Sequence, residues 1–385
     1  MTAHVNRILI VGMLDSVHLA RWLEAIDQTG REIFLFASGP HRRVHRRVQR
    51  MTSGNSRVRI VGPAPWTAIG LWLVDHVLPI GLRARWLRRT INNIKPSVLH
   101  AMEMQHAGYV AERALRACSS SIPFVMTLWG SDVNWFATAR RHKRRIVSVL
   151  KRSTIVISEC DRDLRTCSTL GYRGRKIKII SLTGGLTDAE FDRATQLTPT
   201  SQRRVICVKG YSGFMGRAPL ALRGVVGAVG RDRSWSIAVY AASWYTFVWA
   251  MLLRVACRVD VTAHRKGRLN ATELEEMFAS ARLSVMISRS DGFPAALKES
   301  MLYGAVPVMA DTSCASELLG SEGGMVVVRH PTRESIRSAV GSVLTRDSKI
   351  DEWTRRNQEL LRTSFSEPEY RSRVELTYAA ALAEA

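Results

Sequence analysis

The feature that most constrains this chain is a repeated alternation of short apolar runs with amphipathic helical patterns. The run RILIVG at 7–12 is followed by SVHLARWLEAI at 16–26, in which the apolar residues recur at helical spacing. The same alternation continues through the first half of the chain and restarts after about residue 202. Repeated strand–helix units predict parallel sheets with helices on both faces, which is an α/β, doubly wound architecture.

The pattern predicts two domains of similar size, because 385 residues are too many for one ordinary hydrophobic core. We expect an N-terminal domain at 1–182, a Thr-, Gly- and Asp-rich linker at 183–202, and a C-terminal domain at 203–365. A last helix at 366–385 is expected to pack back on the N-terminal domain. The expected strands are 7–12, 32–38, 58–62, 97–101, 123–130, 154–159 and 176–181, then 203–210, 236–241, 258–264, 283–288, 306–311 and 324–328.

One long apolar stretch, residues 234–256, could be mistaken for a membrane span. It divides better into a strand at 236–241 and a buried helix from about Trp244, and a transmembrane helix is the alternative. The N-terminus runs directly into a strand and has no signal-peptide pattern, and none of the six cysteines forms a CxxC pair. These features predict a cytoplasmic protein.

The net charge of +23 is concentrated in the first half of the chain. Residues 1–180 hold 30 Lys and Arg against 11 Asp and Glu, whereas residues 181–385 hold 26 against 22. A partner of the first half should therefore be anionic: nucleic acid, an acidic membrane leaflet or phosphorylated molecules.

The stretch SRSDGFPAALKESMLYGAVPVMADTS, residues 288–313, predicts a loop, a helix and a buried strand. Pro294 suits the first helical position, and the free N–H groups and dipole of a helix start favour a phosphate. Glu299, inside that helix, can accept two hydrogen bonds from a ribose diol, and Asp291 can accept one from a sugar hydroxyl. The pattern therefore suits a nucleoside diphosphate joined to a sugar.

This stretch resembles the signature of the retaining glycosyltransferases of family 4, which have the GT-B fold. In that family, two acids eight positions apart lie in a segment of the form EGF(G/P)xxxxEAMAxGxPVVAS. Here DGFPAALKESMLYGAVPVMAD keeps the spacing, with Asp291 in the place of the first glutamate. The resemblance extends over about residues 97–330. It implies catalytic roles for Asp291 and Glu299 and donor binding by Gly292, Phe293, Pro294, Ala295, Glu299 and Glu317.

Cations for the donor diphosphate are expected in VKGYSGFMGRA, where family members carry an Arg and a Lys. Lys209 and Arg217 are assigned jointly, with Gly210 as a donor contact, although their order is the reverse of the family's. They would neutralise the charge that develops on the leaving diphosphate. No DxD motif is evident in the signature region, so neither a metal ion nor another cofactor is predicted.

In the first domain, the candidates for acceptor or sugar contacts are Gly12, Ser16, His18 and Asp132. The first three follow the first strand, and Asp132 lies in TLWGSDV, which resembles a family segment with Trp129 in place of a histidine. The resemblance implies front-face attack with retention of configuration, in which the leaving phosphate helps to take the acceptor's proton. That mechanism needs no protein nucleophile.

Each assignment has a structural alternative. Asp291 and Asp132 could be turn residues, Glu299 a solvated helix carboxylate, Lys209 and Arg217 surface charges, and His18 and Glu317 helix-capping residues. The predicted function is sugar transfer to a glycan or lipid-linked acceptor, in cell-surface polysaccharide or glycolipid synthesis. The alternatives are a degenerate, non-catalytic GT-B binding protein at the membrane and a nonhydrolysing sugar-nucleotide epimerase, which would lack this signature.

The basic runs 41–50, 83–89 and 140–145 bear on the partner of the first domain. The second run follows the apolar stretch 63–82, and Trp66, Trp72 and Trp86 beside its arginines suit an interfacial segment on an anionic bilayer. We therefore expect peripheral attachment to the inner face of the membrane, with a solvated basic surface as the alternative. No nucleic-acid-binding motif is present, and no nucleic acid partner is predicted.

Overall fold

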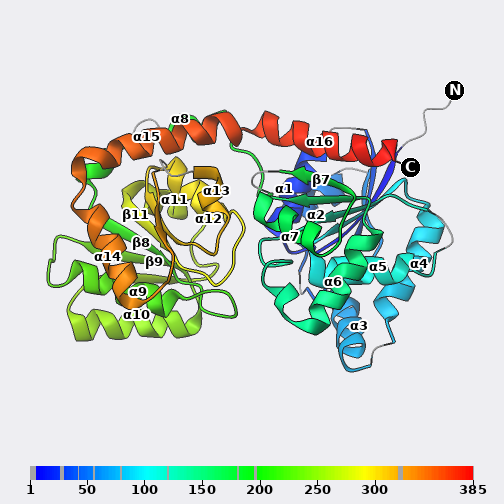
Figure 1. Ribbon diagram of the computed structural model, residues 1–385, viewed down its shortest axis with the longest axis horizontal. Coiled ribbons are helices and arrows are strands. Elements are labelled where there is room, and N and C mark those ends of the chain that lie inside the picture. The colour runs from blue at the N-terminus through cyan, green and yellow to red at the C-terminus, as the bar shows by residue number, and fades with distance from the viewer. Residues whose placement is uncertain are drawn as a thin grey trace. The chain divides into compact units, whose positions relative to one another are not determined.

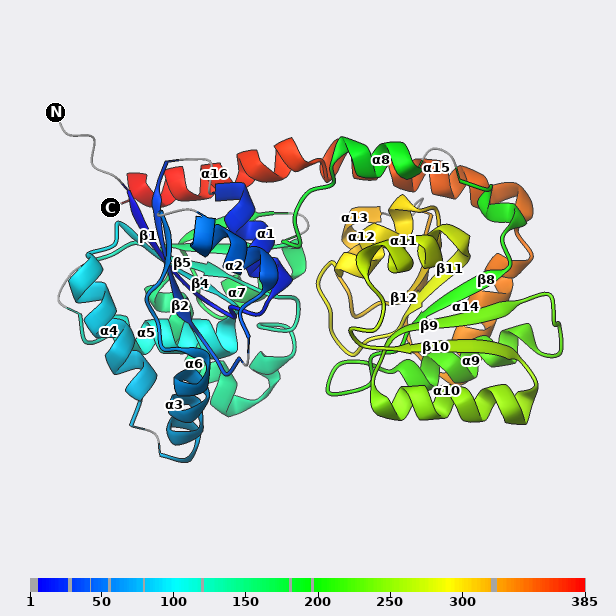
Figure 2. The same ribbon diagram turned by 180° about the vertical axis from the view of Figure 1, so that it is seen from behind.

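The computed structural model describes residues 6–26, 30–41, 43–54, 57–78, 80–118, 121–179, 182–194, 197–319 and 324–384. The chain divides into two compact units: residues 1–185 with 367–385, and residues 186–366. Each unit is an α/β layer structure around a parallel sheet (Figures 1 and 2). Within the described part of the chain, no helix combines the length and apolar character that crossing a bilayer requires.

The first unit is built on a seven-stranded parallel sheet of order β3-β2-β1-β4-β5-β6-β7. Its strands are β1 (Arg7–Gly12), β2 (Glu32–Ala37), β3 (Val58–Ile60), β4 (Val98–Met102), β5 (Phe124–Thr127), β6 (Ile155–Ser158) and β7 (Arg175–Lys178). Its α-helices are α1 (Val17–Ile26), α2 (Arg46–Gly54), α3 (Pro65–Val77), α4 (Leu82–Ile94), α5 (Tyr109–Leu115), α6 (Arg140–Arg152), α7 (Asp161–Thr169) and α16 (Glu367–Ala383).

The second unit holds a six-stranded parallel sheet of order β10-β9-β8-β11-β12-β13. Its strands are β8 (Val205–Lys209), β9 (Ser236–Ala242), β10 (Asp260–Arg265), β11 (Ala281–Met286), β12 (Val306–Ala310) and β13 (Val326–Val328). Its α-helices are α8 (Asp188–Ala194), α9 (Ala218–Val229), α10 (Trp244–Cys257), α11 (Ala271–Ser280), α12 (Ala295–Leu302), α13 (Ala315–Leu319), α14 (Arg333–Leu344) and α15 (Asp347–Ser364).

Two parallel sheets covered by helices confirm the predicted α/β, doubly wound architecture. Strand β1 shows why the apolar runs form such strands: Ile8 and Ile10 belong to the core on one face of the sheet, and Leu9 and Val11 to the core on the other. The predicted strand end at residues 180–181 lies outside the described residues. The segment 183–202, expected to be a linker, contains helix α8 and a short 3₁₀ turn at Thr200–Gln202.

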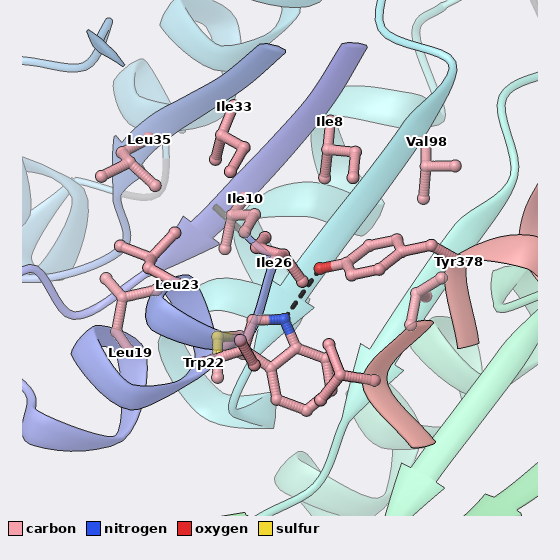
Figure 3. Packing of buried hydrophobic residues seen from close by; sticks show 14 of the residues in the cluster. Ile8, Ile10, Leu19, Trp22, Leu23, Ile26, Ile33, Leu35, Val98 and Tyr378 are labelled. Carbon is pink, nitrogen blue, oxygen red and sulfur yellow. Dashed lines mark hydrogen bonds between the residues drawn. The ribbon is translucent and has the colours of Figure 1, made fainter. Parts of the chain in front are cut away.

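Helix α16 joins the first unit through a buried polar network (Figure 3). Trp22 Nε1 donates to Tyr378 Oη over 2.8 Å, and Tyr378 Oη also lies 2.8 Å from His100 Nδ1. His100 Nε2 lies 2.7 Å from Thr127 Oγ1. Complete burial lowers the pKa of His100 to about 3, so the imidazole is neutral in the folded protein.

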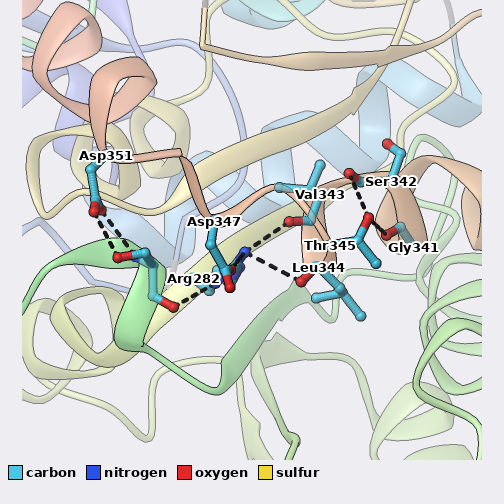
Figure 4. Close-up of polar contacts among 9 residues, drawn as sticks. Arg282, Gly341, Ser342, Val343, Leu344, Thr345, Asp347 and Asp351 are labelled. Atoms are coloured by element: carbon cyan, nitrogen blue, oxygen red, sulfur yellow. Dashed lines mark hydrogen bonds and ion pairs between the residues drawn. The ribbon is translucent and has the colours of Figure 1, made fainter. Parts of the chain in front are cut away.

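A buried arginine holds α14 and α15 on the second sheet (Figure 4). Arg282, on β11, is fully buried, and its Nη2 donates to the carbonyls of Val343 and Leu344 at 3.0 and 3.3 Å. The same nitrogen lies 2.5 Å from Asp347 Oδ1, at the start of α15. The guanidinium therefore adds a donor to carbonyls at the C-terminal end of α14, where Val343 O also accepts from Arg346 N over 3.3 Å.

Candidate functional site

The charged residues of the second unit gather where its strand order reverses. Strand β8 lies between β9 and β11, so the chain leaves the central strands β8 and β11 toward opposite sides of the sheet. Lys209 is the last residue of β8, and the loop that carries Asp291 follows β11. Ligands of open α/β sheets bind at this kind of crevice, outside the carboxyl ends of the strands.

Lys209 and Asp291 meet at this switch point. Lys209 Nζ lies 3.5 Å from Asp291 Oδ2, and the two side chains are 29% and 30% exposed. A partly exposed pair at this distance gains little net stability, because solvent screens it. The lysine charge therefore remains available to an anionic ligand.

The turn after β8 requires a glycine. A Cβ on Gly210 would lie 2.7 Å from Ala242 Cα and 2.7 Å from Val239 Cγ1, closer than real Cβ contacts allow. Gly210 N donates to the Tyr240 carbonyl over 2.7 Å, which holds the turn against β9. Gly210 thus allows the chain to pass directly over the end of the neighbouring strand.

Two further cations lie at the switch point, Arg217 in the loop after β8 and Arg289 in the loop after β11. Arg217 N donates to the Ile287 carbonyl over 3.0 Å, and Arg289 N donates to the Met215 carbonyl over 2.7 Å. Burial lowers the pKa of Arg217, and the positive charge of Arg289 lowers it further. Arg289 was not among the predicted residues, although it lies two positions before Asp291 in the signature.

Helix α12 begins beside Asp291 and has no side-chain cap. Pro294 is its N-cap, with extended backbone angles, and Ala295 is the first helical residue, which corrects the expectation that Pro294 is the first helical position. Gly292 N donates to Asp291 Oδ1 over 3.0 Å, and Phe293 is buried with its ring centroid 4.9 Å from that of Phe365. The helix start therefore keeps its positive dipole end close to Asp291, the partner of Lys209.

The two remaining donor candidates lie on neighbouring helices of the same unit. Glu299 is half-buried in α12; burial raises the pKa of Tyr240, and the negative charges of Glu299 and Asp291 raise it further. Glu317 is exposed in the first turn of α13. Just before this helix, Cys314 N donates to the Gly292 carbonyl over 3.2 Å. The structure thus brings all the predicted donor residues to the carboxyl edge of one sheet.

The carboxyl edge of the first sheet holds the other predicted residues. Gly12 is buried at the end of β1, and Ser16 Oγ accepts a hydrogen bond from His18 N over 3.1 Å at the start of α1. The His18 ring packs edge-on against Trp129, with the ring centroids 5.2 Å apart. The indole of Trp129 therefore occupies one side of His18.

Asp132 lies at this edge but faces inward. It is 4% exposed, and its Oδ2 accepts hydrogen bonds from Trp129 N at 2.8 Å and from Met104 N at 2.9 Å. Burial raises the pKa of Asp132, and the nearby carboxylate of Glu103 raises it further. The structure corrects the expectation of an acceptor-facing carboxylate and supports the alternative, a turn residue.

Glu103, which the sequence analysis did not single out, is the second buried acid of this edge. It follows β4 with φ +87°, and its carboxylate accepts from His106 N at 3.0 Å and from Ala107 N at 2.6 Å. These bonds cap a π-helical turn, Met104–Gly108. Burial raises the pKa of Glu103 to about 7, although its backbone hydrogen bonds and the positive charge of Arg83 act in the opposite direction.

An open groove of about 460 Å³ in the first unit contains none of the residues predicted to contact the donor or the acceptor. It lies along α4 and is lined by Val61, Trp86, Arg89, Thr90, Asn93 and Ile94. The chemistry of the candidate site is therefore at the sheet edges rather than in this groove.

Comparison with known proteins gives matches to two family models and to many solved structures. Residues 76–160 match the model described as glycosyl transferase 4-like, and residues 256–360 match glycosyl transferases group 1. The second match includes Arg289, Asp291, Glu299 and Glu317. No curated protein matches the sequence.

Three of the similar structures cover nearly the whole chain. HepE from Anabaena, solved with UDP and glucose, has a TM-score of 0.68 at 12% identity and covers 97% of this chain and 100% of its own. Sucrose-phosphate synthase from Thermosynechococcus elongatus has a TM-score of 0.72 at 10% identity, covering 99% and 100%. An α,α-trehalose-phosphate synthase (UDP-forming) from Burkholderia vietnamiensis has a TM-score of 0.71 at 12% identity, covering 99% and 100%. At these identities the structures establish the fold alone.

Proposed function

The chain belongs to the group 1 glycosyltransferases with the GT-B fold, and we propose that it transfers a sugar from a nucleotide-sugar donor with retention of configuration. The observation that carries the proposal is the convergence of Lys209, Arg217, Arg289 and the uncapped start of α12 at one switch point. Three cations and a helix dipole suit a diphosphate. Asp291 and Glu299, at the same edge, are the acceptors for the hydroxyls of a sugar and a ribose.

The proposed reaction breaks the bond between the anomeric carbon and the diphosphate oxygen and forms a bond to an acceptor hydroxyl on the same face. The proton of that hydroxyl goes to the departing phosphate oxygen. Lys209, Arg217 and Arg289 stabilise the negative charge that develops on the diphosphate, and Asp291 orients the sugar. Because the proposal assigns protein cations to the diphosphate, it includes no metal ion, and activity should survive chelation by EDTA.

The proposed acceptor is a glycan or a lipid-linked glycan, in cell-surface polysaccharide or glycolipid synthesis at the inner face of the membrane. Support comes from α3 and α4. Trp66, Leu73, Val77 and Leu78 are exposed on and just after α3, and the following helix is rich in arginine. Asp75 is the one acid between residues 63 and 95, and it is turned inward to Arg83 at 3.1 Å. The hairpin thus offers apolar and positive groups to an anionic bilayer.

A thermal-shift panel with UDP, GDP, dTDP and ADP tests the donor class. UDP leads the panel, because the HepE structure holds UDP and glucose. A nucleotide that binds only the folded protein raises the melting temperature by mass action. We expect one nucleotide to stabilise the wild type and Glu276→Ala, an exposed glutamate in α11, but not Glu299→Ala.

The alternatives give different results. A folded protein that responds to none of the four nucleotides would support a non-catalytic binding protein. Interconversion of donor epimers without any acceptor would support a nonhydrolysing epimerase. With a donor identified, the anomeric proton coupling of the product by NMR reports retention or inversion.

A further inference from the structure

Helix α10 in the second unit has apolar side chains on the face that points away from its own sheet. Its inner side packs against β9, β10 and α9 through Thr246 and Ala250, which are fully buried. The outward side chains are Trp244, Tyr245, Val248, Leu252 and Val255, which we name the α10 stripe. Trp244 is 66% exposed and Val255 79% exposed. The sequence analysis expected a buried helix here, and the structure corrects that expectation for this face.

The spacing of the stripe places its five side chains within about a third of the helix circumference, opposite the buried side. A surface helix normally carries charged or polar residues there. Arg254 is the single charged residue of α10, which spans Trp244–Cys257. Figures 1 and 2 show α10 at the outer edge of its unit, with α9 and the sheet on one side. A 14-residue helix is too short to cross a bilayer, so an apolar outer face implies an occupant at the surface.

The charges around the stripe select the occupant. Between residues 243 and 269 the chain holds five Arg and Lys and one Asp. Arg258 caps the end of the helix, Arg265 is the last residue of β10, and the exposed turn after it carries Lys266 and Arg268. The Arg265 guanidinium lies 5.7 Å from the centre of the Trp244 ring, so the basic loop adjoins the stripe directly. Apolar, aromatic and cationic groups in one surface are the combination that an anionic bilayer binds.

A second copy of this chain fits the same surface less well. A symmetric contact through the α10 stripe would bring Arg254, Arg258 and the Arg265 loop of one copy toward those of the other. Each copy also carries a formal charge of +23, so association requires work against their mutual repulsion. An acidic membrane meets the same charges with attraction.

The surface continues from α10 onto the loop of the candidate donor site. Ser212 N donates to Ser243 Oγ over 2.6 Å, and Thr246 Oγ1 donates to Ser212 Oγ over 2.7 Å. Tyr211 and Phe214, on the same loop, are both exposed. This loop connects Lys209 to Arg217, so a ligand on the α10 stripe is held close to the diphosphate cations.

We propose that the α10 stripe, with Tyr211, Phe214 and the Arg265 loop, docks on the surface of an anionic bilayer. This surface lies in the second unit and is separate from the α3–α4 hairpin, and the docking itself does not depend on the proposed transfer. If the transfer is also as proposed, docking would bring the donor loop to a membrane where a lipid-linked acceptor resides.

Co-sedimentation with vesicles of equal parts phosphatidylglycerol and phosphatidylcholine tests the docking. The test variant is Leu252→Ser with Val255→Ser. The control is Leu376→Ser, because Leu376 on α16 is 62% exposed and Leu252 is 56% exposed. We expect the double variant to partition about tenfold or more weakly than wild type, because two apolar side chains no longer leave water. The control and wild type should bind alike, and neither should bind pure phosphatidylcholine strongly.

Quenching of tryptophan fluorescence by brominated lipids locates the contact. The Trp244→Phe variant should lose part of the quenching seen with wild type. The Trp66→Phe variant measures contact by the α3–α4 hairpin, and the two losses should be independent. Equal vesicle binding by the double variant and wild type, or no binding by wild type, would overturn the proposal. So would a wild-type dimer that the double variant converts to a monomer. The nucleotide thermal shift, measured on the same variants, shows whether the donor site still binds nucleotide when membrane docking is lost.

Discussion

The carboxyl edges of the two sheets have the same topology and use their charged residues in opposite ways. In the second unit, Lys209 and Asp291 are partly exposed, and the helix that starts after Asp291 has no side-chain cap. In the first unit, Glu103 and Asp132 are buried, and their carboxylates accept backbone N–H groups of their own loops. One edge leaves its charged side chains partly exposed, whereas the other uses them to fix the loops around His18 and Trp129.

The largest effect should come from the cations of the second edge. Changing Lys209 or Arg217 to Met removes charge stabilisation at the leaving diphosphate and should lower kcat about 10²-fold or more. The melting temperature without nucleotide should stay close to that of wild type, since both side chains are partly exposed. Lys349→Met, an exposed lysine in α15, is the matched control. Steady-state kinetics that show equal rates for all three variants would remove these cations from the mechanism.

The buried acid of the first edge should appear in the pH dependence of stability. Burial raises the pKa of Glu103 from its ordinary value of 4.5 to about 7. Between these values the folded protein keeps a proton that the unfolded chain has released, so stability is highest below the window and falls as the pH rises through it. The fall should be on the order of 3 kcal/mol.

The variant Glu103→Gln isolates this contribution, because an amide keeps an acceptor for His106 N or Ala107 N and does not titrate. Melting curves from pH 4.5 to 8 should be flatter for the variant than for wild type. Unchanged slopes would mean that Glu103 is not the group responsible. Asp291→Asn, at the exposed edge, should leave the slope close to that of wild type.

Residues of these edges could be predicted where they belong to a recognisable sequence pattern, and could not where they do not. Strands such as β1 were predictable because buried parallel strands are nearly continuous apolar runs, as ILIVG at 8–12 is. The donor acids were predictable because their loop and helix are contiguous in sequence. Glu103 has no such signal: its burial results from a φ of +87° and from neighbours on β5 that are distant in sequence.

The inaccurate predictions concern features that a local sequence pattern does not determine: which faces of a helix are covered, where a side chain points, and the backbone angles at a helix start. An apolar pattern predicts a helix but does not say how many of its faces are covered, so α10 was expected to be buried on all sides. Asp132 follows a strand, as an acceptor residue would, yet its carboxylate turns back to Trp129 N and Met104 N. Pro294 is compatible with the N-cap and with the first helical position, and only the backbone angles distinguish the two.

A smaller effect should come from the polar network that joins α16 to the first sheet. Tyr378→Phe removes the acceptor of Trp22 Nε1 and the partner of His100 Nδ1, and both lie in a fully buried setting. Leaving these groups unpaired should cost about 1–3 kcal/mol of unfolding free energy. Tyr245→Phe, at an exposed position of α10, should cost nothing measurable in urea denaturation. Equal midpoints for the two variants would show that the network adds no stability.

The smallest effect concerns the departure at Asp291, where the related family carries glutamate. Asp291→Glu lengthens the side chain toward Lys209 Nζ, which now lies 3.5 Å away, and gives up the bond that Gly292 N donates to Oδ1. These changes oppose each other, so kcat/KM should stay within about threefold of wild type, which corresponds to roughly 0.5 kcal/mol. Asp291→Asn keeps the length and removes the charge, and it should lose considerably more activity, because an amide accepts a sugar hydroxyl less strongly than a carboxylate. A glutamate variant as impaired as the asparagine variant would mean that this edge is fitted to the shorter acid, and that its charge alone does not define the sugar contact.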